Sequence, residues 1–314
     1  MRYYFAPLEG LTDSIFRSLH SKYFPGVCRY YMPFLSPTVH RGLTAREARE
    51  IPAADTLTYE AVPQLLTKVS EDFLWLAGVC ADLGYKEVNL NTGCPSGTVT
   101  AKGKGSGMLR DLQSLEGFLD DIFGKAPLPV SIKTRIGFYN RDEFPAILEL
   151  FNRYPIRELT IHPRIRADFY KGPVDMEAFR YACTSSRNSL CYNGDLTSPS
   201  KILAFAEEFP GVEAVMIGRG LIADPGMLTP GGTDIHALEA FYGELFDAYT
   251  AAFGGTRNAM FRLKENWRYL LCKFEGAERL GKRLKKTTDA GEFRAITHEI
   301  FHTLPLRDEI QPDW

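Results

Sequence analysis

The sequence lacks the features that mark membrane, secreted and strongly basic proteins. Its longest apolar run, residues 73–81, falls well short of the ~20 residues that a membrane-spanning helix needs. An acidic residue, Glu9, stands where a signal peptide would have its apolar core. The 37 basic residues do not outnumber the 39 acidic ones, so overall charge does not indicate a nucleic-acid partner. We expect no membrane association and a cytoplasmic location.

Closely spaced cysteines are also missing. The six cysteines are scattered through 314 residues without a Cys-x-x-Cys pair. This pattern favours free thiols in a reducing compartment over a disulfide framework or structural zinc, so we expect no metal. The content of 45% hydrophobic and 24% charged residues is that of an ordinary globular chain, and wholesale disorder is excluded.

Strand-like and helical segments alternate over the first 230 residues. Strands are expected at 3–6, 27–30, 61–65, 88–90, 130–133, 159–162, 190–193 and 214–217, with helical apolar spacing between most of them. Eight such repeats predict a (β/α)₈ TIM barrel, an α/β fold, over residues 1–230. The segment TPGGTD (229–234) breaks the pattern, and residues 235–314 are expected to form a smaller all-helical C-terminal domain.

Polar and glycine residues gather where the expected strands end. The carboxyl ends of barrel strands open onto one face, which is where active sites lie in this fold. Any one such residue is usually structural, but six strand ends carry one. They are Pro7, Leu8, Glu9, Gln64, Asn91, Cys94, Lys133, Arg135, His162, Arg164, Asn193, Gly194, Asp195, Gly218 and Arg219.

The last two clusters indicate a phosphate site. Glycine amides in residues 193–195 (NGD) and 218–220 (GRG) can approach an anion closely, with Arg219 as the countercharge. The loops after strands seven and eight are the usual phosphate position of a TIM barrel. A pair of tight turns is the alternative.

Three single residues have a functional and a structural interpretation. Lys133 can meet an anion or an electron-rich ring inside the barrel, or be a solvated strand end. His162 can be functional or a satisfied core histidine. Cys94, held between glycine and proline, can project its thiol toward the barrel mouth as a nucleophile or acid, or be a small buried apolar residue.

The loop KGKGSG (102–107) fits neither nucleotide-binding motif, and we expect Lys102 in a mobile basic loop that closes over a polyanionic substrate.

Taken together, these motifs resemble the tRNA-dihydrouridine synthase family. The segments that carry the resemblance are 6–13 (APLEGLTD), 91–95 (NTGCP), 132–137 (IKTRIG), 162–164 (HPR), 170–172 (YKG), 193–195 (NGD) and 215–220 (VMIGRG). They cover the whole barrel in order. The resemblance implies an FMN-containing barrel with a helical RNA-binding domain, in which NADPH supplies electrons to reduce a flipped uracil in tRNA. No dinucleotide motif separates NADPH from NADH.

The resemblance also assigns roles to residues. Cys94 would donate the proton to C5 of uracil, and Asn91 would contact the flavin ring or the uracil. Lys102 and Arg164 would contact the RNA. The flavin would be lined by Pro7, Leu8, Glu9, Gln64, Lys133, His162, Asn193, Gly194, Asp195, Gly218 and Arg219.

The C-terminal region carries a local positive charge. Residues 251–290 hold ten Lys or Arg against four acids, and Arg257, Arg262, Lys285 and Lys286 are predicted to contact tRNA. A solvated helical face is the alternative.

Two other functions are alternatives. A flavin barrel that acts on a free pyrimidine, similar to a dihydroorotate dehydrogenase, has no need for this positive charge. A non-catalytic RNA-binding barrel has no need for Cys94 and Lys133. The sequence indicates no obligate protein partner.

Overall fold

The computed structural model describes residues 1–38 and 40–314, and in it strands and helices alternate as expected. Every expected strand is present, with bounds that differ by a few residues. The strands are β1 (Arg2–Phe5), β2 (Arg29–Tyr31), β3 (Ala61–Val62), β4 (Gln64–Leu65), β5 (Val88–Thr92), β6 (Val130–Gly137), β7 (Leu159–Ile165), β8 (Leu190–Tyr192) and β9 (Ala214–Ile217).

The strands form one sheet in the order β3-β2-β1-β9-β8-β7-β6-β5-β4. Neighbouring strands run parallel, as in the pairs β5–β6 and β6–β7. The two ends of this order, β3 and β4, are separated along the chain only by Pro63, which has no backbone N–H to donate. They are therefore two halves of one expected strand, and the sheet curls into a nearly closed ring. The TIM-barrel expectation is confirmed.

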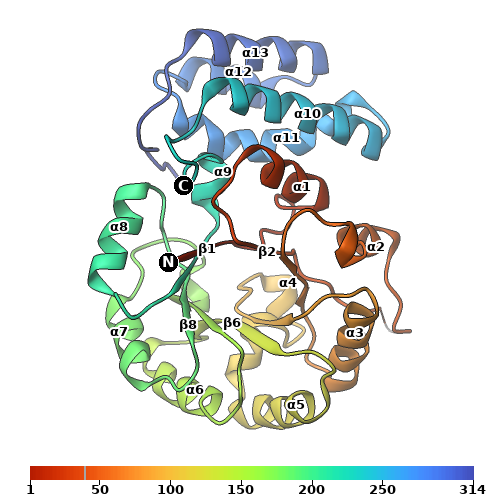
Figure 1. The fold of residues 1–314 in the computed structure, drawn as a ribbon, viewed down its shortest axis with the longest axis vertical. Coiled ribbons are helices and arrows are strands. Elements are labelled where there is room, and N and C mark those ends of the chain that lie inside the picture. The colour runs from red at the N-terminus through yellow and green to blue at the C-terminus, as the bar shows by residue number, and fades with distance from the viewer. Residues whose placement is uncertain (39) are drawn as a thin grey trace. The chain divides into compact units, whose positions relative to one another are not determined.

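Helices α3 (Ser70–Asp82), α5 (Leu112–Lys125), α6 (Phe144–Phe151) and α7 (Met176–Ser185) lie outside the strands (Figure 1). Helix α5 shows why these segments are helical: Asp111 caps its first turn by accepting a hydrogen bond from the Ser114 amide. Its buried residues Leu115, Phe118, Leu119 and Ile122 recur every three or four positions. Shorter helices are α2 (Ala45–Glu50), α4 (Gly97–Thr100) and the 3₁₀ turns η1 (Ala54–Thr56), η2 (Gly105–Arg110), η3 (Arg141–Glu143) and η4 (Arg166–Asp168).

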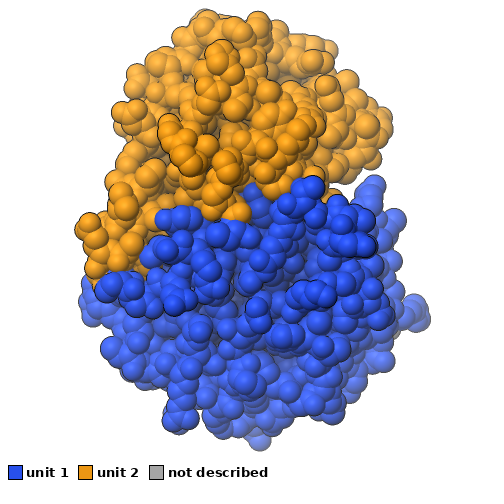
Figure 2. Space-filling view, viewed as in Figure 1, with its two compact units in different colours: residues 1–7, 28–194, 209–216 blue, residues 8–27, 195–208, 217–314 orange. Residues whose placement is uncertain are grey.

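Two compact units make up the chain, coloured separately in Figure 2. Unit 1 contains residues 1–7, 28–194 and 209–216, and therefore most of the barrel. Unit 2 contains residues 8–27, 195–208 and 217–314. The division into a catalytic domain (1–230) and an RNA-binding domain (235–314) stays a prediction.

Unit 2 is helical. Its helices are α1 (Ser14–Tyr23), α8 (Pro199–Glu208), α9 (Arg219–Ala223), α10 (Ile235–Phe253), α11 (Thr256–Leu270), η5 (Leu271–Lys273), α12 (Glu278–Lys286) and α13 (Ala290–Thr303). Trp267 on α11 packs against the rings of Phe274, Phe293 and Phe301. Among the described residues, no helix is long and apolar enough to cross a membrane.

Candidate active site

Polar side chains fill one side of the barrel interior in unit 1. Paired residues of adjacent parallel strands share a face of the sheet, so the register brings Gln64 beside Asn89, Asn91 beside Lys133, and Arg135 beside His162. The opposite side is apolar, with Tyr4, Ala6, Tyr31, Val62, Cys191, Ala214 and Met216 in one buried cluster. The barrel therefore has a polar wall and an apolar wall.

The sequence placed two of these side chains wrongly along their strands. Lys133 and His162 were expected at strand ends, but β6 continues to Gly137 and β7 to Ile165. The two strands pair beyond the expected ends, with a register irregularity between Arg135 and Gly137. In the sequence, the alternating charged residues of these two segments indicated that the strands end there. In the structure, both strands are longer and these residues lie on their inner face.

A chain of amide hydrogen bonds organises the polar wall. Asn91 Nδ2 donates to Gln64 Oε1 (2.7 Å), Gln64 Nε2 donates to Asn89 Oδ1 (2.8 Å), and Asn89 Nδ2 donates to Ser131 Oγ (2.9 Å). Gln64, Asn89 and Ser131 are almost completely buried. Because each amide has its partners, the wall is rigid and its donors and acceptors are fixed in direction.

The same network sets the position of Cys94. Asn91 Oδ1 accepts hydrogen bonds from the amides of Gly93 (3.0 Å) and Cys94 (2.9 Å), which closes the turn after β5. On the other side, the Ser106 hydroxyl donates to the Cys94 carbonyl oxygen (2.8 Å). These hydrogen bonds hold the backbone of Cys94, which is half-buried.

Part of the basic loop packs directly against Cys94. Gly105 has a φ of +58°, and a Cβ at this position would lie 2.9 Å from the Cys94 carbonyl oxygen and 3.0 Å from its Cβ. Residues 105–109 are buried in the turn η2, so this part is folded against the site, while Lys102 is exposed. Part of the loop therefore lies beside Cys94, and closure over a substrate stays a prediction.

Lys133 is the unpaired charge of the polar wall. Among residues 1–38 and 40–314 its ammonium group has neither a hydrogen bond nor an ion pair. Burial, together with the nearby charge of Arg135, lowers the pKa of Lys133 to about 8, while the thiols of Cys94 and Cys191 favour its charged form. A half-buried ammonium without a counterion is a site for an anion or a polarised acceptor.

Arg135 and Arg164 lie beyond Lys133 toward the carboxyl ends of the strands. Arg135 donates to three backbone carbonyls, those of Gly93 (2.9 Å), Ile165 (2.9 Å) and Phe169 (2.5 Å). Arg164 lies 2.9 Å from His162 Nε2, and because a guanidinium can only donate, this nitrogen is the acceptor and Nδ1 carries the proton. His162 also stacks on Tyr170.

An alternating stack of guanidinium groups and rings surrounds this end of the barrel. Phe138 has Arg110 at 5.0 Å on its ring and Arg166 at 5.6 Å, and Arg166 also lies 5.1 Å from the ring of Phe169. Phe169 adopts a φ of +50°, a conformation that is uncommon outside glycine. Next to this stack Tyr139 is 65% exposed. These residues were not predicted from the sequence, although the aromatic pairs after two neighbouring strands (138–139 and 169–170) are visible in it.

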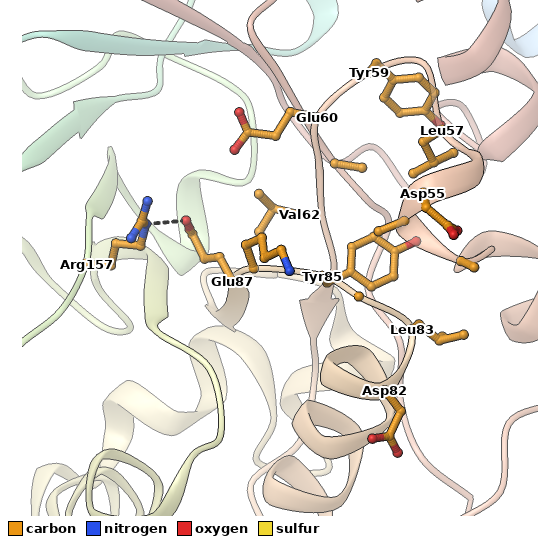
Figure 3. Close-up of a pocket in the computed structure, with 15 residues that line it drawn as sticks. Asp55, Leu57, Tyr59, Glu60, Val62, Asp82, Leu83, Tyr85, Glu87 and Arg157 are labelled. Atoms are coloured by element: carbon orange, nitrogen blue, oxygen red, sulfur yellow. Dashed lines mark ion pairs between the residues drawn. The ribbon is translucent and has the colours of Figure 1, made fainter.

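At the amino ends of the strands, arginine side chains are paired with carboxylates. A cavity of about 570 Å³ lies there, lined by residues from 53–62 and 82–87 and by Arg157. In Figure 3, Arg157 points toward Glu87, and their ion pair measures 2.7 Å. Arg29 pairs with both Glu60 and Glu87. By contrast, in the described part of the chain Arg110, Arg135 and Arg166 have no carboxylate partner, so the positive charge of these three side chains at the carboxyl ends is uncompensated.

The predicted cofactor residues are divided between the units. Pro7, Gln64, Lys133, His162, Asn193 and Gly194 belong to unit 1, and Leu8, Glu9, Asp195, Gly218 and Arg219 to unit 2. Asn193 Nδ2 donates to the Met216 carbonyl oxygen, which ties β8 to β9. Within unit 2, Arg219 forms an ion pair with Asp195 (2.7 Å), so its charge is partly compensated.

Several basic residues of the tail have structural partners. Arg262 pairs with Asp13, the residue that caps α1, and Lys273 is buried against Asp224. Arg279 and Arg283 pair with Glu299. Among the described residues of 235–314, the exposed basic side chains without a carboxylate partner include Arg257, Arg268, Lys282, Lys285, Lys286 and Arg294. The tRNA contacts of all these residues stay predictions.

Comparison with known proteins identifies the family. The family model described as "Dihydrouridine synthase (Dus)" matches residues 4–239. The chain is 28% identical over 226 residues to tRNA-dihydrouridine synthase B of Vibrio cholerae, a match that covers 68% of this chain and 66% of that relative, slightly under two thirds. It is 29% identical to a probable tRNA-dihydrouridine synthase of Staphylococcus epidermidis, over 97% of this chain and 95% of the relative.

Among solved structures, morphinone reductase shares the fold. The TM-score is 0.51 at 11% sequence identity, with 74% of this chain and 86% of that chain covered. At this identity the likeness concerns the barrel architecture alone. Since the family model spans three quarters of the sequence, including Cys94 and Lys133, the chain belongs to the dihydrouridine synthase family.

Proposed function

We propose that this protein reduces the C5–C6 double bond of specific uridines in tRNA, with FMN as its cofactor and NADPH as the reductant; NADH stays an alternative. The observation that carries the proposal is the pairing of a half-buried thiol, Cys94, with an unpartnered ammonium group, Lys133, on the polar wall of a dihydrouridine synthase barrel.

The polar wall fits a flavin ring. An isoalloxazine ring presents carbonyl oxygens and ring nitrogens along one edge. Within the described residues Lys133 has no hydrogen-bond partner, and one of these flavin atoms would accept a hydrogen bond from its ammonium group. Gln64 and His162 lie on strands at either side of Lys133 and would orient the same edge. Bound there, FMN would supply the redox chemistry that connects the nicotinamide with C6 of the uracil. In unit 2, Asp195, Gly218 and Arg219 would hold the phosphate, with Pro7, Leu8 and Glu9 as further contacts.

Cys94 would complete the reduction. Hydride addition at C6 leaves negative charge delocalised over C5 and the neighbouring carbonyl group of the uracil, and this charge must be quenched by an acid. The Cys94 thiol would transfer its proton to C5, which forms the C5–H bond and leaves a thiolate. Asn91 holds the Cys94 amide and so fixes the direction of the thiol.

The charge distribution favours RNA over a free pyrimidine. Arg110, Arg166 and Lys102 offer accessible positive charge in this region of unit 1. The buried guanidinium groups of Arg135 and Arg164 add to the positive potential there. Phosphate contacts of this kind supply most of the affinity for nucleic acid. A uridine in folded tRNA must be extruded to reach Cys94, which requires the RNA to be held firmly. The exposed lysines of α12 would extend this contact in unit 2, and the location would be the cytoplasm.

Purification with flavin analysis tests the proposal. We expect the protein to carry one FMN per chain, released on denaturation, and to transfer electrons from NADPH to tRNA but not to free uracil or dihydroorotate. Turnover of a free pyrimidine without tRNA would favour the dehydrogenase alternative. A protein that binds tRNA but takes up no flavin in excess FMN would favour the non-catalytic alternative.

A further inference from the structure

Two histidines and a glutamate meet in the helical unit, away in the sequence from the candidate active-site residues of unit 1. Glu239 lies on α10, and His298 and His302 lie one turn apart near the end of α13. Each offers one ligand atom, and these atoms lie within 4.8 Å of one another. Within residues 1–38 and 40–314 this is the one group of three metal-ligating side chains so placed.

The distances fit a small divalent ion. His298 Nδ1 and His302 Nδ1 lie 3.5 and 3.6 Å from the same oxygen, Glu239 Oε1. A tetrahedral ion with metal–ligand distances of about 2.0–2.2 Å separates its ligand atoms by roughly 3.3–3.6 Å. The two imidazole rings lie 3.9 Å apart by their centroids, so both are close enough to face one ion.

The end of α13 favours a cation at the two histidines, whereas Arg294, on the lining of the neighbouring cavity, contributes positive charge. His298 and His302 occupy the last turns of α13, where the unpaired carbonyl groups of the helix end carry partial negative charge. His302 Nδ1 also lies 3.0 Å from the His298 carbonyl oxygen, and an ion bound at this nitrogen would replace that contact. The side chains are partly exposed, so the ion can enter from solvent.

A cavity beside the three side chains is a second, independent observation. It measures about 380 Å³ and has Glu239 and His298 on its lining, with aromatic walls from Phe246, Trp267 and Phe293. The hydroxyl group of Tyr242, which lines the same cavity and is 4% exposed, is buried without a hydrogen-bond partner. An unpaired buried hydroxyl is costly unless a ligand or water completes it.

We propose that Glu239, His298 and His302 bind a divalent transition-metal ion of the Zn²⁺ class, with the fourth coordination position open to this cavity. Three protein ligands with one open position leave room for a water molecule or a small anionic ligand. The ion would join the beginning of α10 to the end of α13. The absence of Cys-x-x-Cys spacing argued against zinc in the sequence, but imidazole and carboxylate ligands from two helices do not produce that pattern.

Calorimetric titration of the EDTA-stripped full chain with ZnCl₂ tests the site. We expect one ion per chain with micromolar or tighter affinity. Because even residues that only orient a ligand typically change metal affinity 10–100-fold, His302→Ala and Glu239→Gln should each weaken binding at least about tenfold. His236→Ala removes another exposed histidine of α10 outside the group and should leave binding unchanged. The exposed thiols Cys28 and Cys183 contribute the same background in every variant.

Cobalt provides a readout that does not depend on stability. Co²⁺ in a four-coordinate site absorbs much more strongly in the visible range than hexaaqua Co²⁺, and the band should appear with the parent and be lost in Glu239→Gln, the variant least able to disturb folding. Equal Zn²⁺ affinity in parent and both ligand variants, or parental binding only at millimolar concentration, would overturn the proposal. Neither measurement uses tRNA reduction, so the result is independent of the proposed activity.

Discussion

Replacing Lys133 by methionine should stabilise the flavin-free protein while weakening its hold on FMN. The pKa of Lys133 is lowered from 10.5 to about 8, so the folded state binds a proton at this position less well than the unfolded state does. By linkage this difference costs the folded protein up to ~3 kcal/mol below pH 8. Methionine has a similar length and no charge, so the variant escapes that cost.

The sign of the pH dependence follows from the same pKa. Below pH 8 Lys133 is protonated in both states and the full cost is present. As the pH rises from 8 toward 10.5 the folded state has lost the proton that the unfolded state still binds, and the stability of the parent rises. The Lys133→Met variant lacks this rise, so its advantage at pH 7 should shrink to nothing near pH 10.

Flavin binding should change in the opposite direction. A hydrogen bond from a charged donor contributes about 1.5–3 kcal/mol, which predicts an FMN affinity roughly 10–150-fold weaker in Lys133→Met at pH 7. In the parent the affinity for FMN should fall as the pH rises above 8, because the Lys133 ammonium group of the flavin-free protein loses its proton. The variant should show no such fall. Urea unfolding of the stripped protein and quenching of FMN fluorescence measure the two effects. A variant that is less stable without flavin and binds FMN as tightly as the parent would refute this reasoning.

Three further predictions concern the substrate. Cys94→Ala should leave NADPH-driven flavin reduction intact and slow uracil reduction by ~10²–10⁴-fold, as measured by rapid mixing; equal rates of dihydrouridine formation would remove Cys94 from the mechanism. Replacing Lys285 and Lys286 by alanine should flatten the dependence of log tRNA affinity on log salt by about one unit or more, while an unchanged slope would make α12 a solvated face. Tyr139→Ala should weaken tRNA binding about tenfold if its exposed ring stacks on a base, whereas Tyr181→Ala, a change of an exposed tyrosine on α7, should not; equal effects would exclude stacking.

The barrel was predictable because its signals are local. Each strand is a short β-rich run, and the strand–helix alternation leaves few arrangements. The interruption at Pro63 was not predicted, because one unbroken strand was expected over 61–65, although proline cannot donate to a sheet. Strand ends were less predictable. Lys133 and Arg135 are two positions apart, as expected for side chains on the same face of a strand, but charged residues are more common where a strand has ended.

Side-chain partners could not be predicted from local signals. Arg262 belongs to a basic stretch, and its ion pair with Asp13 joins residues 249 positions apart. The stack of Phe138 between Arg110 and Arg166 draws on three separate loops of unit 1. The four-residue spacing of His298 and His302 is visible in the sequence, but Glu239 comes from another helix and could not be matched to it. In each case the fold, and not the neighbouring sequence, chooses the partner.

Direct reduction of tRNA tests the central claim most directly. tRNA from a strain that lacks this protein would be incubated with the purified, FMN-loaded protein and NADPH, and its nucleosides would be analysed by mass spectrometry. The account predicts that defined uridines gain two mass units as dihydrouridine, and that the gain disappears with Cys94→Ala on the same time scale. Flavin-loaded protein that oxidises NADPH but leaves every uridine of this tRNA unchanged would contradict it.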